Sequence, residues 1–317
     1  MAICLIAANA DVSGIGVRTS VYVQALLFLA STLLHTNLDA HEVDNILSRL
    51  VQEGLASLLT GLAILVSAIV QARTVGLTVY HALVILNMSW ITIVIAIVPY
   101  SVSLALILPH INMASAKEQL DRMFLVHVAH FSLTAIFGLW VFYDLKSFDT
   151  TPRNCTSSMV FYFGRYFHVF DVPFQRLWKG IYFLAIIPIL NAAILTIALS
   201  PILFLSAFIM RMYEAAQGRM KTPCPTPVPS LLPPSHKPPI AQQIGILLAA
   251  SIVTTLLIVS TEKTIKANSV APGENQWTLG QTFALLLTIP RVLEVVIVGR
   301  LRIRRLFRKP IIDITLV

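Results

Sequence analysis

The side chains with the greatest chemical potential in this sequence are ionisable or strongly polar groups within or beside long apolar stretches. They are Asp11, Arg18, Gln24, His81, Asn87, His127, His130, Asn191, Arg291 and Glu294. Such groups are costly in hydrocarbon, so each is a candidate for an ion or substrate pathway, or for a polar contact between helices. Which of these roles each side chain has depends on the helix that carries it and on what that helix packs against.

The most distinctive local pattern places Gly14 and Gly16 between Asp11 and Arg18, at the start of an apolar stretch. Glycines leave backbone N–H groups accessible, and a helix N-terminus beside a guanidinium attracts anions. The pattern predicts an anion site, or a ring of Arg18 side chains at a pore entrance if several protomers surround it. The alternative is an Asp11–Arg18 ion pair, with glycines for close helix packing and Arg18 reaching to the interface.

Two further pairs lie on single helical faces because their members are three residues apart. Arg291 and Glu294 are expected to neutralise each other inside a helical bundle, and a charge relay or transport site is the alternative. His127 and His130 could share a metal ion, but no third ligand is evident. We therefore predict no metal and no cofactor.

The sequence lacks the residues and motifs that common classes of enzyme require. Glu294 is the one clear acidic residue within the apolar stretches, which disfavours catalysis by paired carboxylates. No Gly-x-Ser-x-Gly, His-Glu-x-x-His or phosphate-binding loop occurs. We predict no catalytic residues and favour a protein that is not an enzyme.

The composition of the chain points to lipid as its surroundings. Of 317 residues, 56% are hydrophobic and 12% are charged, with a mean hydropathy of +0.79. Soluble domains carry roughly 25% charged residues. We predict an all-α polytopic transmembrane bundle of about seven spans, because helices satisfy their own backbone groups in lipid. The predicted spans are Gly16–His35, Gly54–Val70, Val75–Val98, Met123–Tyr143, Gly180–Met210, Ile240–Ser260 and Trp277–Val298.

Two apolar segments are longer than a bilayer requires. Residues 75–108 are interrupted by Pro99, and residues 179–212 by Pro188 and Pro201. Proline kinks or breaks a helix, so each segment is one long helix or two shorter ones. We favour one helix that extends beyond the bilayer, because no polar turn separates the halves.

The chain divides into a membrane domain with spans 1–5 (residues 1–216), a linker (217–240), spans 6–7 (241–299) and a tail (300–317). The linker contains eight prolines and is predicted to be extended and cytoplasmic. Six of the 23 Lys and Arg residues cluster in the tail, which is typical of a stop-transfer segment that binds anionic lipids. Because the charge follows an apolar span, nucleic acid is not an expected partner.

Basic residues also predict the orientation. Seven spans with the tail inside leave 13 Lys and Arg inside and 9 outside, so the N-terminus is outside or lumenal and the C-terminus cytoplasmic. The membrane is the plasma membrane or an endomembrane. Asn154 then forms a glycosylation sequon on the outer side. Cys4 and Cys155 share that oxidising side and could form a disulfide or remain two free thiols.

Three motifs carry a resemblance. They are Asp11-Val-Ser-Gly14-Ile-Gly16-Val-Arg18 with Tyr22 and Gln24, Tyr80-His81 with Asn87-Met-Ser89-Trp90, and Trp277-Thr-Leu-Gly280-Gln281. In these the chain resembles a family of uncharacterised fungal multi-span membrane proteins, whose first span opens with Asn-Pro-Asp where this chain has Asn9-Ala10-Asp11. The resemblance implies a fungal source and a multi-span fold, and it implies no activity.

The leading functional hypothesis is a channel or transport-type protein that forms homo-oligomers, because polar residues interrupt otherwise apolar spans. A seven-span receptor or sensor is the alternative, suggested by topology alone. An intramembrane enzyme acting on a lipid or isoprenoid is a further alternative. It would need a deep pocket with converging ionisable groups.

Overall fold

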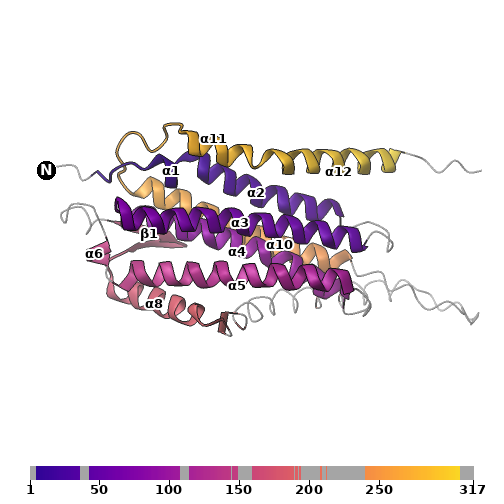
Figure 1. The fold of residues 1–317 in the computed structure, drawn as a ribbon, viewed down its shortest axis with the longest axis horizontal. Coiled ribbons are helices and arrows are strands. Elements are labelled where there is room, and N and C mark those ends of the chain that lie inside the picture. The colour runs from indigo at the N-terminus through magenta and orange to yellow at the C-terminus, as the bar shows by residue number, and fades with distance from the viewer. Residues whose placement is uncertain are drawn as a thin grey trace, which may run out of the picture.

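The computed structural model of the chain describes residues 5–35, 43–107, 114–143, 145–148, 159–188, 190–191, 193, 208, 212 and 240–307. It is an all-α bundle of long helices with one short hairpin (Figure 1). The long helices are α2 (Ile15–His35), α3 (Val43–Thr74), α4 (Val79–Ile107), α5 (Ala114–Tyr143), α10 (Ile240–Ala267) and α12 (Ile289–Phe307). The shorter elements are α1 (Ala10–Ser13), α6 (Leu145–Phe148), β1 (Val160–Phe163), β2 (Arg165–His168), α8 (Val172–Ile186) and α11 (Leu279–Leu286).

Six segments of the described chain are long and apolar enough to cross a membrane. They are Ala10–Leu34, Ser48–Thr74, Val79–Val102, Glu118–Tyr143, Gln243–Ala267 and Leu279–Arg300. At about 1.5 Å rise per residue, each exceeds the roughly 30 Å hydrocarbon core. The all-α membrane bundle predicted from the sequence is therefore confirmed.

The predicted span Gly180–Met210 falls largely outside the described residues, and only its first part, in and just after α8, is described. Lys179 at the start of this segment donates to the Tyr143 carbonyl at the end of α5, at 3.3 Å. Asn191 donates to Ser132 Oγ, at 3.2 Å, halfway along α5. The chain thus runs back antiparallel to α5. α10 then begins at the far end of the bundle from the start of α8 (Figure 1).

We call the two ends of the bundle the N-end, where α1 and α11 lie, and the C-end, where α12 finishes (Figure 1). The first and last described residues thus lie at opposite ends.

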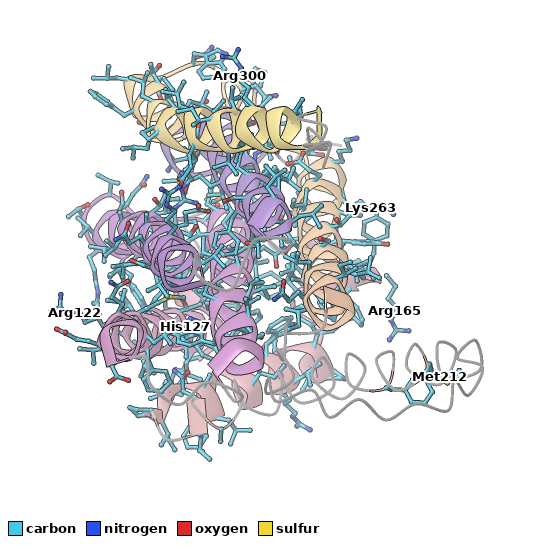
Figure 2. All side chains as sticks on the ribbon, turned by 90° about the vertical axis from the view of Figure 1, so that its right-hand side faces the viewer. Arg122, His127, Arg165, Met212, Lys263 and Arg300 are labelled. Atoms are coloured by element: carbon cyan, nitrogen blue, oxygen red, sulfur yellow. The ribbon has the colours of Figure 1, made fainter. Side chains whose placement is uncertain are left out.

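Helix α4 is the central element, and its composition explains why. Its candidate span is 83% buried, against 11% for Leu279–Arg300. It packs against α2, α3, α5 and α10. A helix that is apolar on all sides belongs inside a bundle. α12, in contrast, lies along one edge when the bundle is viewed end-on, and apolar side chains such as Leu293 and Ile297 are exposed (Figure 2).

The prediction of one continuous helix across Pro99 is confirmed, since α4 runs unbroken from Val79 to Ile107. The turn before it uses Gly76, whose φ of 87° lies in the left-handed region that favours glycine. The other long segment, residues 179–212, falls mostly outside the described residues. So do Cys4, Cys155, Asn154 and the proline-rich linker.

The β1–β2 hairpin turns at Gly164, whose φ is 72°. A polar stripe on α10 holds its first strand. Asn268 accepts from the Val160 N–H at 3.1 Å, Thr264 accepts from the Tyr162 N–H at 3.0 Å, and Ser260 donates to the Tyr162 carbonyl. These side chains, four residues apart, replace a neighbouring strand. They fix the hairpin at the N-end.

Candidate functional site

The start of the chain is held against the connection between α10 and α11. The Ile6 N–H donates to the Ser269 carbonyl, and the Ala271 N–H donates to the Ile6 carbonyl, both at 2.8 Å. This parallel bridge brings residues 5–13 over the N-end of α4. A buried polar network forms there, which we call the N-end network: Asn9, Ser13, Arg18, Thr78, His81, Glu262, Glu274 and Gln281.

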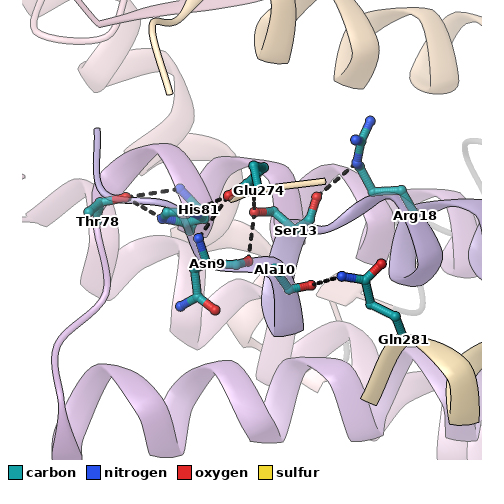
Figure 3. A network of polar contacts seen from close by, with 8 residues as sticks. All are labelled: Asn9, Ala10, Ser13, Arg18, Thr78, His81, Glu274 and Gln281. Carbon is teal, nitrogen blue, oxygen red and sulfur yellow. Dashed lines mark hydrogen bonds and ion pairs between the residues drawn. The ribbon is translucent and has the colours of Figure 1, made fainter. Parts of the chain in front are cut away.

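Glu274 is the centre of the N-end network (Figure 3). Its carboxylate accepts from the Asn9 N–H at 2.8 Å and from the Ser13 hydroxyl. His81 Nε2 lies 3.4 Å from the same carboxylate. Burial acts to raise the pKa of Glu274, but the hydrogen bonds from His81, Ser13 and Asn9 outweigh it and hold the pKa below its usual range. Glu274 is therefore ionised, and it joins three separate segments.

Thr78 precedes α4 and completes a hydroxyl–imidazole–carboxylate chain. Its Oγ1 lies 2.6 Å from His81 Nδ1 and accepts from the His81 N–H at 3.4 Å. Similar chains activate nucleophiles in enzymes. Here the Thr78 oxygen caps a helix and the residue is buried, so the geometry fits structural capping.

Arg18 is buried and differs from both sequence-based expectations. Its Nε donates to the Ser13 carbonyl at 2.8 Å, and its Nη1 pairs with Glu262 of α10. Tyr22 also donates to Glu262, at 3.0 Å. The expected partner Asp11 is exposed instead, so the Asp11–Arg18 ion pair is wrong. Arg18 turns inward because a carboxylate lies across the α2–α10 interface, and it does not reach to the interface with water.

Gly14 and Gly16 serve close packing. Gln281 of α11 accepts from the Gly16 N–H at 2.8 Å and donates to the Ala10 carbonyl at 2.9 Å. A Cβ on Gly16 would lie 2.6 Å from Gln281 Cβ, and one on Gly14 would lie 2.4 Å from Gln281 Nε2. The space and the N–H group that an anion would need are occupied by Gln281. The close-packing alternative is thus the one the geometry favours.

The other predicted polar residues of the spans link helices. Asn87 donates to Ser260 at 3.1 Å and joins α4 to α10. Asn191 joins the segment after α8 to α5. Gln24 is buried in α2, and its Nε2 has no hydrogen-bond partner among the described residues.

His127 and His130 are fully buried on α5. Their four ring nitrogens have no hydrogen-bond partner in the described part of the chain. His127 instead contacts the rings of Tyr100 and Phe131 edge-on. The described residues contain no group of three His, Cys, Asp or Glu side chains placed to hold a metal.

A second charged cluster, the α12 cluster, lies in the half of the bundle towards the C-end. It contains Ser31, Glu53, Ser57, Arg291 and Glu294, from α2, α3 and α12. Arg291 Nη1 donates to Ser57 Oγ at 2.8 Å, and Nη2 donates to the Glu53 carbonyl at 2.7 Å. No close Arg291–Glu294 ion pair is present among the described residues, because the guanidinium reaches across to α3, and mutual neutralisation of the two charges stays a prediction.

The Glu53 carboxyl group faces the same cluster. It accepts from the Ser31 hydroxyl at 2.9 Å, and the Glu294 carboxyl of α12 is near enough to interact with it electrostatically. Glu53 is 8% exposed and Arg291 is 9% exposed. The cluster thus brings one guanidinium and two carboxyl groups together inside candidate spans.

Sequence reasoning missed Glu53, Glu262 and Glu274. The predicted second span began at Gly54, one residue after Glu53, and the predicted sixth span ended at Ser260, two residues before Glu262. A usable signal was present in both helices, since Glu53 and Ser57 share a face of α3, and Ser260, Thr264 and Asn268 repeat every fourth residue. Glu274 lies in a connection, and no local pattern marks it.

An apolar layer separates the two clusters along α2. Ala25, Phe28 and Leu29 are buried between Gln24 and Ser31, and Phe28 is completely inaccessible. A cavity of about 120 Å³ between α4 and α10 offers no polar route, since its lining is apolar apart from Ser101. The charged groups are therefore separated in this conformation.

No family model, curated protein or solved structure matches this chain. The resemblance to uncharacterised fungal membrane proteins stays a prediction.

Proposed function

We propose that this integral membrane protein is a transport-type protein that moves a small ion or polar solute across the membrane. The observation that carries the proposal is the α12 cluster, where Arg291, Glu53 and Glu294 meet inside candidate spans. Charged residues in a membrane interior are expensive and mark ion or substrate pathways more often than structural contacts.

The apolar layer around Phe28 favours a carrier or a gated path over a permanently open pore. Phe28 is fully buried between the two charged clusters. A path joining them therefore requires the helices to rearrange, as alternating-access proteins do around a site within the bundle. In an oligomeric channel, in contrast, the path would run between protomers.

The proposed orientation places the N-end outside or in a lumen and the C-end in the cytosol. The distribution of Lys and Arg supports it, because Arg300, Arg302, Arg304 and Arg305 all lie at the C-end of α12. We expect this basic end of α12 to lie at anionic headgroups, and a homo-oligomer remains part of the proposal.

Flux into liposomes tests the proposal. Purified protein reconstituted into vesicles should move protons, alkali cations or small anions faster than protein-free vesicles. Arg291→Gln should reduce this flux at least tenfold, whereas Arg122→Gln should not, because Arg122 is exposed and pairs only with Glu118.

Equal flux for the two variants would contradict the proposal, as would the absence of any flux for the wild type. Glu53→Gln is a second, nearly isosteric variant for the case that Arg291→Gln does not fold. Monodispersity in detergent identifies the folded variants.

A receptor is the second candidate, favoured by the ordered N-end network at the face proposed to be outside. It predicts no flux. It also predicts that a bound ligand raises the melting temperature of the wild type, with Asn9, Ser13 and Glu274 near the ligand.

A further inference from the structure

We propose that the β1–β2 hairpin and the last turns of α10 form a binding surface for anionic phospholipid headgroups in the leaflet at the N-end. We call it the hairpin surface, and it consists of Tyr162, Phe163, Arg165, Tyr166, Lys263 and Lys266. The proposal does not depend on the proposed transport function. It concerns the opposite end of the bundle from the arginines of α12 (Figure 1).

The length of α10 places this surface at the depth of the headgroups. The candidate span Gln243–Ala267 contains 25 residues, whereas about 20 residues cross the hydrocarbon core of a bilayer. Helix α10 has no charged residue before Glu262, so its charged last turns are the part that extends beyond the hydrocarbon. Lys263 and Lys266 therefore lie at the level of the headgroups.

The cations of the hairpin surface are held by aromatic rings and not by acids. Lys263 Nζ lies 4.4 Å from the centre of the Tyr162 ring and donates to the Tyr162 hydroxyl at 3.2 Å. The Arg165 guanidinium carbon lies 4.6 Å from the centre of the Phe167 ring. A cation–π contact positions a cation but leaves its full charge in place.

No carboxylate neutralises this surface within the part of the chain that the structure describes. None pairs with Arg165, Lys263 or Lys266, and all three side chains are exposed. The nearest acid along α10, Glu262, is paired with Arg18. The surface thus presents three positive charges, which complement the phosphate of a headgroup. It favours a headgroup of net negative charge, because phosphatidylcholine adds a cation that finds no carboxylate here.

The aromatic side chains of the hairpin fit the same depth. Phe163 and Tyr166 are 55% and 56% exposed, and the rings of Tyr162 and Tyr166 meet edge-on with their centres 5.0 Å apart. Exposed aromatic rings with polar ends are typical of the boundary between acyl chains and headgroups. The rings therefore keep the neighbouring cations at the level of the phosphates.

The hairpin surface faces away from the bundle and is formed before any lipid binds. Arg165 and Lys263 both lie on the outer side of α10 when the bundle is viewed along its axis (Figure 2). The hydrogen bonds from β1 to Asn268 and Thr264 hold the hairpin against α10. A preformed surface loses little conformational freedom when a ligand binds.

Hydrogen–deuterium exchange of the full chain in lipid nanodiscs tests the surface. In the wild type, the amides of β2 should exchange about fivefold more slowly in equal parts of phosphatidylglycerol and phosphatidylcholine than in phosphatidylcholine alone, as expected for one strong contact between a basic residue and an anionic surface. The double variant Arg165→Gln, Lys263→Gln should lose this difference.

Two variants serve as controls for this experiment. Arg165→Lys, Lys263→Arg keeps both charges and should keep the slower exchange. Arg122→Gln removes an exposed charge from α5 and should also keep it. Arg165→Gln, Lys266→Gln replaces the first double variant if that variant is not monodisperse.

Three outcomes would overturn the proposal. The first is equal exchange of the wild type in the two lipid compositions. The second is slower exchange that persists in the double variant without Arg165 and Lys263. The third is protection that needs two copies of the chain in one nanodisc and does not need phosphatidylglycerol, because it would show that a second copy covers the hairpin surface.

Discussion

The N-end network and the α12 cluster both bury an arginine with two glutamates nearby, yet they balance their charges differently. At the N-end, Glu262 is paired with Arg18, and Glu274 has three separate donors. In the α12 cluster, Arg291 donates to the neutral oxygens of Ser57 and the Glu53 backbone, and the Glu53 carboxyl accepts from the Ser31 hydroxyl. A network whose charges are directly paired stabilises one conformation, whereas a cluster without such pairing can respond to a bound ion.

Among the substitutions that test this comparison, the largest effect on stability is expected at Glu274. Glu274→Ala removes the acceptor for Asn9, Ser13 and His81 in a buried site, and should lower the free energy of unfolding by about 3 kcal/mol. Thermal unfolding in detergent measures it. Glu118→Ala, at an exposed position, is the control and should change it by less than about 0.5 kcal/mol. Equal effects of the two substitutions would mean that the network does not stabilise the fold.

Close packing at the N-end gives the next effect. Gly16→Ala places a Cβ 2.6 Å from Gln281 Cβ, and should destabilise the protein by about 2 kcal/mol. Gly180→Ala on α8 meets nothing within 4 Å and should be neutral or slightly stabilising. If Gly16→Ala instead left stability unchanged but altered anion binding, the anion-site hypothesis would be revived for this motif.

The pH dependence of stability is the smallest expected effect. Because the folded state holds the pKa of Glu274 below that of the unfolded chain, its contribution is fully present above about pH 4.3. It is lost as the pH falls through the folded value. Melting temperatures of the wild type should therefore drop on acidification by more than those of Glu274→Gln. Parallel curves would show that Glu274 does not titrate differently in the folded protein.

The sequence predicted the bundle well and its internal partners poorly, for a physical reason. Apolar spans are local properties, so the helices and the continuity of α4 across Pro99 could be predicted. Arg18 and Arg291 were expected to pair with acids seven and three residues away, but their partners are 244 and 238 positions distant. Only the folded arrangement of α2, α10, α3 and α12 brings those groups together.

The boundaries of the spans had a second consequence. Hydropathy fades near helix ends, so Glu53 and Glu262 fell just outside the predicted spans, although both lie within the observed candidate spans. The predicted spans therefore contained almost no acidic residues. For that reason Glu294 was the acidic partner that the sequence suggested for Arg291.

The most direct test of the functional distinction between the two clusters measures stability and ion flux for one substitution in each. Glu294→Gln should abolish ion flux into liposomes while leaving the melting temperature near that of the wild type. Glu274→Gln should lower the melting temperature, and at temperatures where it remains folded it should retain flux. The reverse pattern, with stability lost in Glu294→Gln and flux lost in Glu274→Gln, would contradict the assignment of function to the α12 cluster.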